Sequence, residues 1–71
     1  MEEAFYNGYT AILGGGCQGL YEEGLKIGTV HHIEGFYFVH SEDVTGASED
    51  SLESALAQWA NLRSILSSAR K

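Results

Sequence analysis

Three histidines and one cysteine are the side chains of this sequence that could bind a metal or form a catalytic dyad. They are His31, His32, His40 and Cys17. Imidazole and thiolate are the usual ligands of zinc, but the chain has no second cysteine and no compact ligand spacing such as Cys-x-x-Cys. A reactive thiolate also needs a nearby cation or a helix N-terminus, and Cys17 stands among glycines. We therefore expect no metal site, no dyad and no enzymatic activity.

The glycine-rich stretch at 14–19 matches the pattern G-x-G-x-x-G and follows a predicted strand. A dinucleotide site needs a helix directly after this pattern, because the helix N-terminus presents N–H groups to the pyrophosphate. The residues that follow, Leu20, Tyr21 and Glu22, favour a short strand instead. We interpret 14–19 as a loop and expect no cofactor.

The chain is acidic, with ten Asp and Glu residues against four Lys and Arg residues and a net charge of −6. This charge opposes direct binding to nucleic acid and to anionic membranes, and it favours a basic partner protein. No apolar run approaches the roughly 20 residues that span a membrane. Glu2 and Glu3 stand where a secretory signal would need positive charge, and a lone cysteine excludes an intrachain disulfide. We expect a cytoplasmic protein.

Hydrophobic periodicity predicts one α+β domain over residues 1–71. Residues 1–47 are expected to form a β-meander, an antiparallel sheet of three to four strands that includes the loop at 14–19. Residues 48–69 are expected to form one C-terminal amphipathic helix, with Ser48 as N-cap and Glu49 and Asp50 in the first turn. The helix should pack on one face of the sheet through a stripe of Leu52, Ala55, Leu56, Trp59, Leu62 and Leu66.

Two details of the predicted sheet stay open at this stage. The turn at Glu34-Gly35 allows a two-residue loop that pairs Ile33 with Phe36, or a three-residue loop that pairs His32 with Phe36. Phe36, Phe38 and His40 share a face in either register. The second detail is the turn signal at 7–8, an Asn-Gly pair, because the arm before it is short enough to indicate a bulge or a later strand start.

One helix cannot cover both faces of a sheet. The uncovered face is expected to carry some of Tyr9, Tyr21, Val30, Tyr37 and Val39. Such a face is either hydrated or in contact with a partner or a second copy, so a homodimer is one possible assembly.

The acidic residues occur mainly in pairs, at expected turns and at the helix start. In a meander, the turn at 22–23 and the strand exit at 42–43 lie at the same end of the sheet. The predicted helix start follows only a few residues later. We therefore predict an acidic pole that binds a partner, with exposed tyrosines as anchors: Glu22, Glu23, Glu42, Asp43, Glu49, Asp50, Tyr21 and Tyr37.

Residues 25–66 resemble the HicB-like antitoxins. The likeness rests on a turn, an aromatic strand, an Asp-x-x-Gly loop and a helix opening, which are here Glu34-Gly35, Phe36 to Val39, Asp43-Val44-Thr45-Gly46 and Asp50-Ser51-Leu52-Glu53-Ser54-Ala55-Leu56. This resemblance implies neutralisation of a small, basic, RNA-cleaving toxin by occlusion.

In size, acidity and lack of catalytic motifs, the chain also resembles phage-encoded anti-CRISPR proteins. Both resemblances imply an acidic surface that occupies a Lys- and Arg-lined site meant for nucleic acid. The resulting hypothesis is a small non-enzymatic inhibitor of a basic, nucleic-acid-binding protein. A homodimeric interaction module of another role is the alternative.

Overall fold

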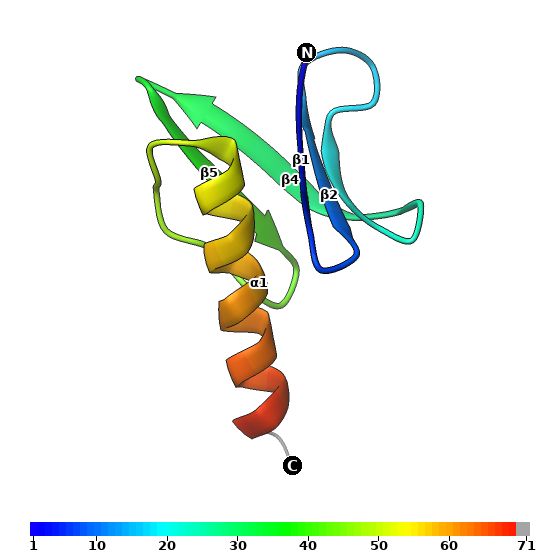
Figure 1. Ribbon diagram of the computed structural model, residues 1–71, viewed down its shortest axis with the longest axis vertical. Helices are drawn as coiled ribbons and strands as arrows, with labels where there is room; N and C mark the ends of the chain where they lie inside the picture. Colours follow the sequence, from blue (N-terminus) through cyan, green and yellow to red (C-terminus); the bar gives the residue numbers. More distant parts are fainter. Residues whose placement is uncertain (70–71) are drawn as a thin grey trace.

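The computed structural model, which describes residues 1–69, is an α+β fold with five antiparallel strands and one helix (Figure 1). The strands lie in the sheet in the order in which they occur in the chain, so that every connection is a hairpin. The α+β class is confirmed, but the sheet has five strands and the prediction of three to four was too low. The elements are β1 (Glu2–Tyr6), β2 (Tyr9–Leu13), β3 (Gly19–Glu22), β4 (Leu25–Ile33), β5 (Phe36–Ser41) and α1 (Leu52–Ala69).

The additional strand exists because Asn7-Gly8 is a hairpin turn between β1 and β2. Both residues have positive φ, 48° for Asn7 and 85° for Gly8. A two-residue turn of this kind matches the right-handed twist of the strands on either side. The same geometry recurs at the β3–β4 and β4–β5 hairpins, where a glutamate takes the first position and a glycine the second: Glu23-Gly24 and Glu34-Gly35.

The hairpin of β4 and β5 has the two-residue loop, with Ile33 paired to Phe36 and Val30 paired to Val39. This pairing settles the register that was open at the sequence level. It also sets His31 opposite Phe38.

The sheet is curled, and α1 lies in its concave side, against β1, β2 and β5. Small side chains on the concave face leave room there for Trp59, which is completely buried. The ring of Tyr9 also lies on this side, in edge contact with Trp59 at a centroid distance of 4.8 Å. The principal core residues are Ala4, Ala11, Leu20, Val30, Val39, Leu52, Ala55, Leu56 and Trp59.

The predicted assignment of the sheet faces was therefore largely wrong. Val30 and Val39 are completely buried in the core, and Tyr9 and Tyr37 pack against it. Among the five residues expected on the uncovered face, alternation along the strands leaves only Tyr21 there. The uncovered face instead carries Phe36 and Phe38, because they alternate with Tyr37 and Val39, which face the core.

The helix begins at Leu52 and not at Ser48. The backbone N–H of Ser54 donates to Oγ of Ser51 across 3.1 Å, which makes Ser51 the N-cap. The residues before it run antiparallel to β5, and Tyr37 and Glu49 exchange backbone hydrogen bonds of 2.7 and 2.8 Å. This pairing covers the outer edge of β5 and delays the helix start.

Within residues 1–69, no helix combines the length and the apolar character needed to cross a membrane.

Candidate interaction surface

The predicted acidic pole does not form, because its members lie at opposite ends of the sheet. Glu22 and Glu23 close the β3–β4 hairpin, and Glu42 and Asp43 follow β5 at that same end. Glu49 pairs with Tyr37 near the start of β5, so that Glu49 and the adjacent Asp50 lie at the other end. The prediction was wrong because it placed the helix start beside the exit of β5. The intervening segment in fact runs back along the whole strand.

At the end that holds the β3–β4 hairpin, two carboxylates are paired with Arg63 of α1. Nη1 of Arg63 lies 3.4 Å from Oε1 of Glu22, and Nε lies 3.7 Å from Oδ2 of Asp43. The guanidinium carbon also lies 5.5 Å from the ring centroid of Trp59 and 5.7 Å from that of Tyr9. We call this the Arg63 end; it also carries Glu23, Glu42 and Lys26. Its two described cations therefore offset half of its four carboxylates.

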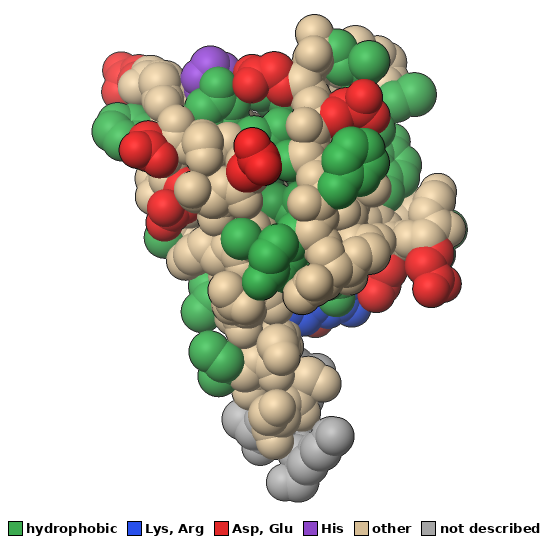
Figure 2. Space-filling view, viewed as in Figure 1, with side chains coloured by type: hydrophobic (Ala, Val, Ile, Leu, Met, Phe, Trp, Pro, Cys, Tyr) green, Lys and Arg blue, Asp and Glu red, His purple; other side chains and the backbone are tan. Residues whose placement is uncertain are grey.

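Six of the ten carboxylates lie at the opposite end of the sheet, which we call the acidic end. They come from the start of β1, the β4–β5 turn and the start of α1. Among residues 1–69 the only Lys and Arg side chains, Lys26 and Arg63, belong to the Arg63 end. Figure 2 shows acidic side chains around the start of α1 and the neighbouring strand ends, with the basic atoms in view below them. The acidic end consists of Glu2, Glu3, Glu34, Glu49, Asp50 and Glu53.

Tyr37 lies within the acidic end and connects the two edge strands of the sheet. Its hydroxyl donates to the carboxylate of Glu2, with Oη 3.2 Å from Oε2 and 3.4 Å from Oε1. Its ring stacks on that of His32, with centroids 4.1 Å apart and an interplanar angle of 2°. Partial burial, followed by the charge of Glu2 and the hydrogen bond to it, raises the pKa of Tyr37 above its usual value. Tyr37 was predicted as an anchor, and it is a fixed, half-exposed ring among carboxylates.

Tyr21, the other predicted anchor, contacts the glycine-rich loop. Its hydroxyl donates to the backbone oxygen of Cys17 across 2.8 Å. In the same loop Gln18 accepts from the N–H of Gly14 and donates to the carbonyl of Val30, at 2.8 and 3.0 Å. These bonds attach the glycine-rich loop to β3 and β4. Tyr21 therefore helps to hold this loop in place.

The histidines do not gather with Cys17. His31 lies on the outer side of the sheet, stacked on Phe38 and His40 with centroids 4.9 and 5.3 Å away. Cys17 is a free, exposed thiol in the glycine-rich loop. In the described part of the chain, no group of three or more His, Cys, Asp or Glu side chains is arranged as metal ligands would be.

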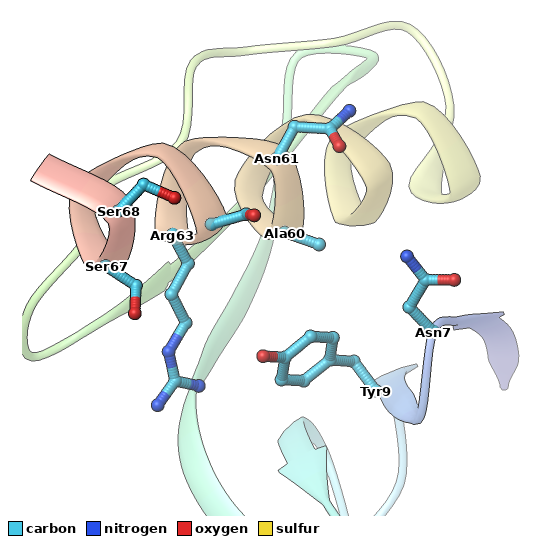
Figure 3. Close-up of a pocket in the computed structure, with 8 residues that line it drawn as sticks. Asn7, Tyr9, Ala60, Asn61, Arg63, Ser67 and Ser68 are labelled. Carbon is cyan, nitrogen blue, oxygen red and sulfur yellow. The ribbon is translucent and has the colours of Figure 1, made fainter.

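Two open hollows flank Arg63 at the Arg63 end. One, of about 580 Å³, lies between the β1–β2 turn and the last turns of α1, and in Figure 3 Arg63 and Tyr9 point into it. The other is lined by Lys26, Ile27, Ser41, Glu42, Asp43 and Arg63. Amide and hydroxyl groups dominate the first lining, which comprises Asn7, Tyr9, Ala60, Asn61, Arg63, Ser64, Ser67 and Ser68. In the second lining the Ser41 hydroxyl lies 2.6 Å from Oδ1 of Asp43, but Ser41 is buried and its oxygen also accepts a hydrogen bond from Nε1 of Trp59.

No protein-family model, curated protein or solved structure matches this chain.

Glu2, Glu3, Glu34 and Glu53 belong to the acidic end but were not among the residues predicted to bind a partner. The Asn7-Gly8 turn signal was sufficient to place Glu2 in this group. Once that pair is accepted as a hairpin, the start of β1 must lie at the same end as the β4–β5 turn. The position of Glu49 could not be predicted from the local sequence, because it depends on a pairing with Tyr37, which lies twelve residues earlier in the chain.

Proposed function

We propose that this chain is a small non-enzymatic binding protein that inhibits a nucleic-acid-acting partner by occupying its basic surface with the acidic end. The observation that carries the proposal is the separation of charge: six carboxylates without a described Lys or Arg at one end, and the described cations at the other. A surface of this kind is complementary to a Lys- and Arg-lined channel built for phosphates.

The acidic end is also well ordered for binding. Glu49 is held by two backbone hydrogen bonds to β5, and Tyr37 is held by His32 and Glu2. Side chains that are already fixed lose less conformational entropy on association. Tyrosine is among the residues that contribute most at interfaces, because it buries a large area and retains a polar tip. We therefore place Tyr37 at the centre of the contact.

The fold and the surface offer less support for an enzyme or a small-molecule carrier. The hollows beside Arg63 are open to solvent and the first is lined mainly by polar groups, whereas ligand sites are mostly enclosed and apolar. A binding role requires only the shape and charge of the acidic end.

The test begins with affinity capture from the source cell, followed by binding measurements on the purified partner. We expect a basic nucleic-acid-binding protein whose affinity for the chain falls steeply between 50 and 500 mM salt, and which nucleic acid displaces from the complex. A CRISPR effector and an RNA-cleaving toxin are the two partner classes that the sequence resemblances imply.

Charge reversal locates the contact. The double variant Glu49→Lys/Asp50→Lys should weaken binding at least about tenfold, because it reverses two charges of the acidic end. The matched control Glu23→Lys/Glu42→Lys introduces the same charge change at the Arg63 end and should have a much smaller effect. Equal losses would show that net charge alone matters, and a partner that nucleic acid does not displace would refute the inhibitory mechanism.

A further inference from the structure

The side of the sheet that faces away from α1 carries a group of apolar and aromatic side chains. We call it the open face. Strand alternation, counted from the buried residues Ala4, Ala11, Val30 and Val39, defines its members. They include Phe5, Ile12, His31, Ile33, Phe36, Phe38 and His40.

Several large side chains of the open face are strongly exposed. Phe5 is 70% exposed, Ile33 54% and Phe36 53%. Single exposed apolar residues are ordinary on soluble proteins, but a group of them on one sheet face is typical of an interaction surface. The helix cannot cover this face, because it occupies the concave side.

The middle of the open face is already ordered. The ring of His31 stacks on Phe38 and on His40, with interplanar angles of 25° and 6°. Thr29 Oγ1 lies 3.2 Å from Nε2 of His31, within hydrogen-bonding distance. Three parallel rings held in this way lose little side-chain entropy when another surface covers them.

The charge of the open face selects its partner. Alternation places only Glu3 and Lys26 on it, so this face is close to neutral in a chain of net charge −6. Two copies that met through their acidic ends would repel each other, whereas two open faces bring no excess of carboxylates together. A strongly basic partner would gain no charge complementarity here.

The size of the open face is sufficient for a dimer. Five strands spaced about 4.8 Å apart form a surface about 24 Å wide when followed around the curl of the sheet. A stable interface buries about 800 Å² on each partner, and the chain exposes 4513 Å² in total. One broad side of the molecule can therefore supply the area required. We propose that the open face joins two copies of this chain into a homodimer by sheet-on-sheet packing.

The experiment is sedimentation equilibrium on the purified chain from about 5 to 500 μM, at physiological salt. We expect a concentration-dependent shift from 7.7 kDa to twice that mass. In NMR spectra recorded over the same range, the amide shifts that change should be those of β4 and β5. A strict monomer at the highest concentration would overturn the proposal.

Variants locate the contact within the dimer. Phe36→Lys and Phe38→Lys place a cation on the open face of both copies, and each should raise the dimer dissociation constant at least tenfold. Ile65→Lys is the control, because Ile65 is 64% exposed on α1, away from this face. Phe36→Lys should disturb folding less than Phe38→Lys, because Phe36 is 53% exposed and Phe38 is half-buried. Melting curves verify that each variant remains folded. If Ile65→Lys dissociated the dimer and Phe36→Lys did not, the contact would belong to the helix and the proposal would be wrong.

This dimer does not depend on the proposed inhibitory function. Inhibition is read from partner binding by acidic-end variants, and dimerisation is read from the mass of the isolated chain. Either proposal can fail while the other stands.

Discussion

The indole Nε1 of Trp59 donates a hydrogen bond to Oγ of Ser41 across 3.2 Å, inside the core. Ser41 in turn donates to Oδ1 of Asp43 across 2.6 Å. The largest core side chain is thereby oriented by the last residue of β5. Because the same segment carries Asp43, which pairs with Arg63, the helix and the sheet are connected both by packing and by polar contacts.

Removing the Ser41 hydroxyl should destabilise the fold. Ser41→Ala leaves the Trp59 N–H buried without its acceptor, and we expect a loss of about 1–3 kcal/mol in the free energy of unfolding. Urea denaturation followed by tryptophan fluorescence measures this change. Thr45→Ala, at an exposed position of the adjacent segment, is the control and should stay within about 0.5 kcal/mol of the wild type. Equal stability of the two variants would show that this hydrogen bond contributes nothing.

The N-cap can be tested by a pair of serines. Ser51→Ala removes the acceptor of the Ser54 N–H and should cost about 1 kcal/mol. Ser48→Ala changes an exposed residue before the helix start and should cost much less. Chemical denaturation monitored by circular dichroism at 222 nm compares the two variants. A larger loss for Ser48→Ala would mean that the helix in solution begins earlier, as the sequence pattern had predicted.

Gly28 is a position where a side chain cannot be accommodated. A Cβ there would lie 2.3 Å from the carbonyl oxygen of His40 and 3.0 Å from Cδ2 of Leu20. We expect Gly28→Ala to reduce the free energy of unfolding by at least about 2 kcal/mol, because the strand must move to relieve the overlap. Gly16→Ala is the matched control, since a Cβ at Gly16 has no atom within 4 Å and its φ is not positive. The control should leave the melting temperature unchanged or slightly higher.

The titration of Tyr37 should report its contact with Glu2. The raised pKa means that the folded protein keeps a proton that the unfolded chain loses near pH 10. The free energy of unfolding should therefore fall as the pH rises above about 10, through the folded pKa. The difference in absorbance at 295 nm between the wild type and Tyr37→Phe isolates this single titration.

Two glutamate variants test the cause of the Tyr37 shift. Glu2→Gln removes the neighbouring charge and should move the Tyr37 titration to lower pH. Glu3→Gln carries the same change on the opposite face of β1 and should leave the titration where it is. If both variants shift it equally, the overall charge of the acidic end determines the pKa instead of the contact with Glu2.

The positions of the acidic residues could be predicted only in part from the sequence. The acid pairs at turns were recognised, and Glu49 and Asp50 do belong to the acidic end. Glu22 and Asp43 were assigned to the same group, but both lie at the other end of the sheet, where they share an ion pair with Arg63 of the distant helix. A pairing across 41 positions between Glu22 and Arg63 has no local signature, because it depends on how α1 crosses the sheet.

The sequence by itself determined the element types, the Glu-Gly turn positions and the apolar stripe of the helix from Leu52 to Leu62, although Leu66, expected in that stripe, is 42% exposed. Each of these follows from local backbone preference and periodicity, which act between residues close in the chain. Only the tertiary structure decided which sheet face is covered, where the helix begins and which end is acidic. Those features depend on the volume available under Trp59 and on the pairing of Glu49 with the edge of β5, and both arise only once distant segments are packed together.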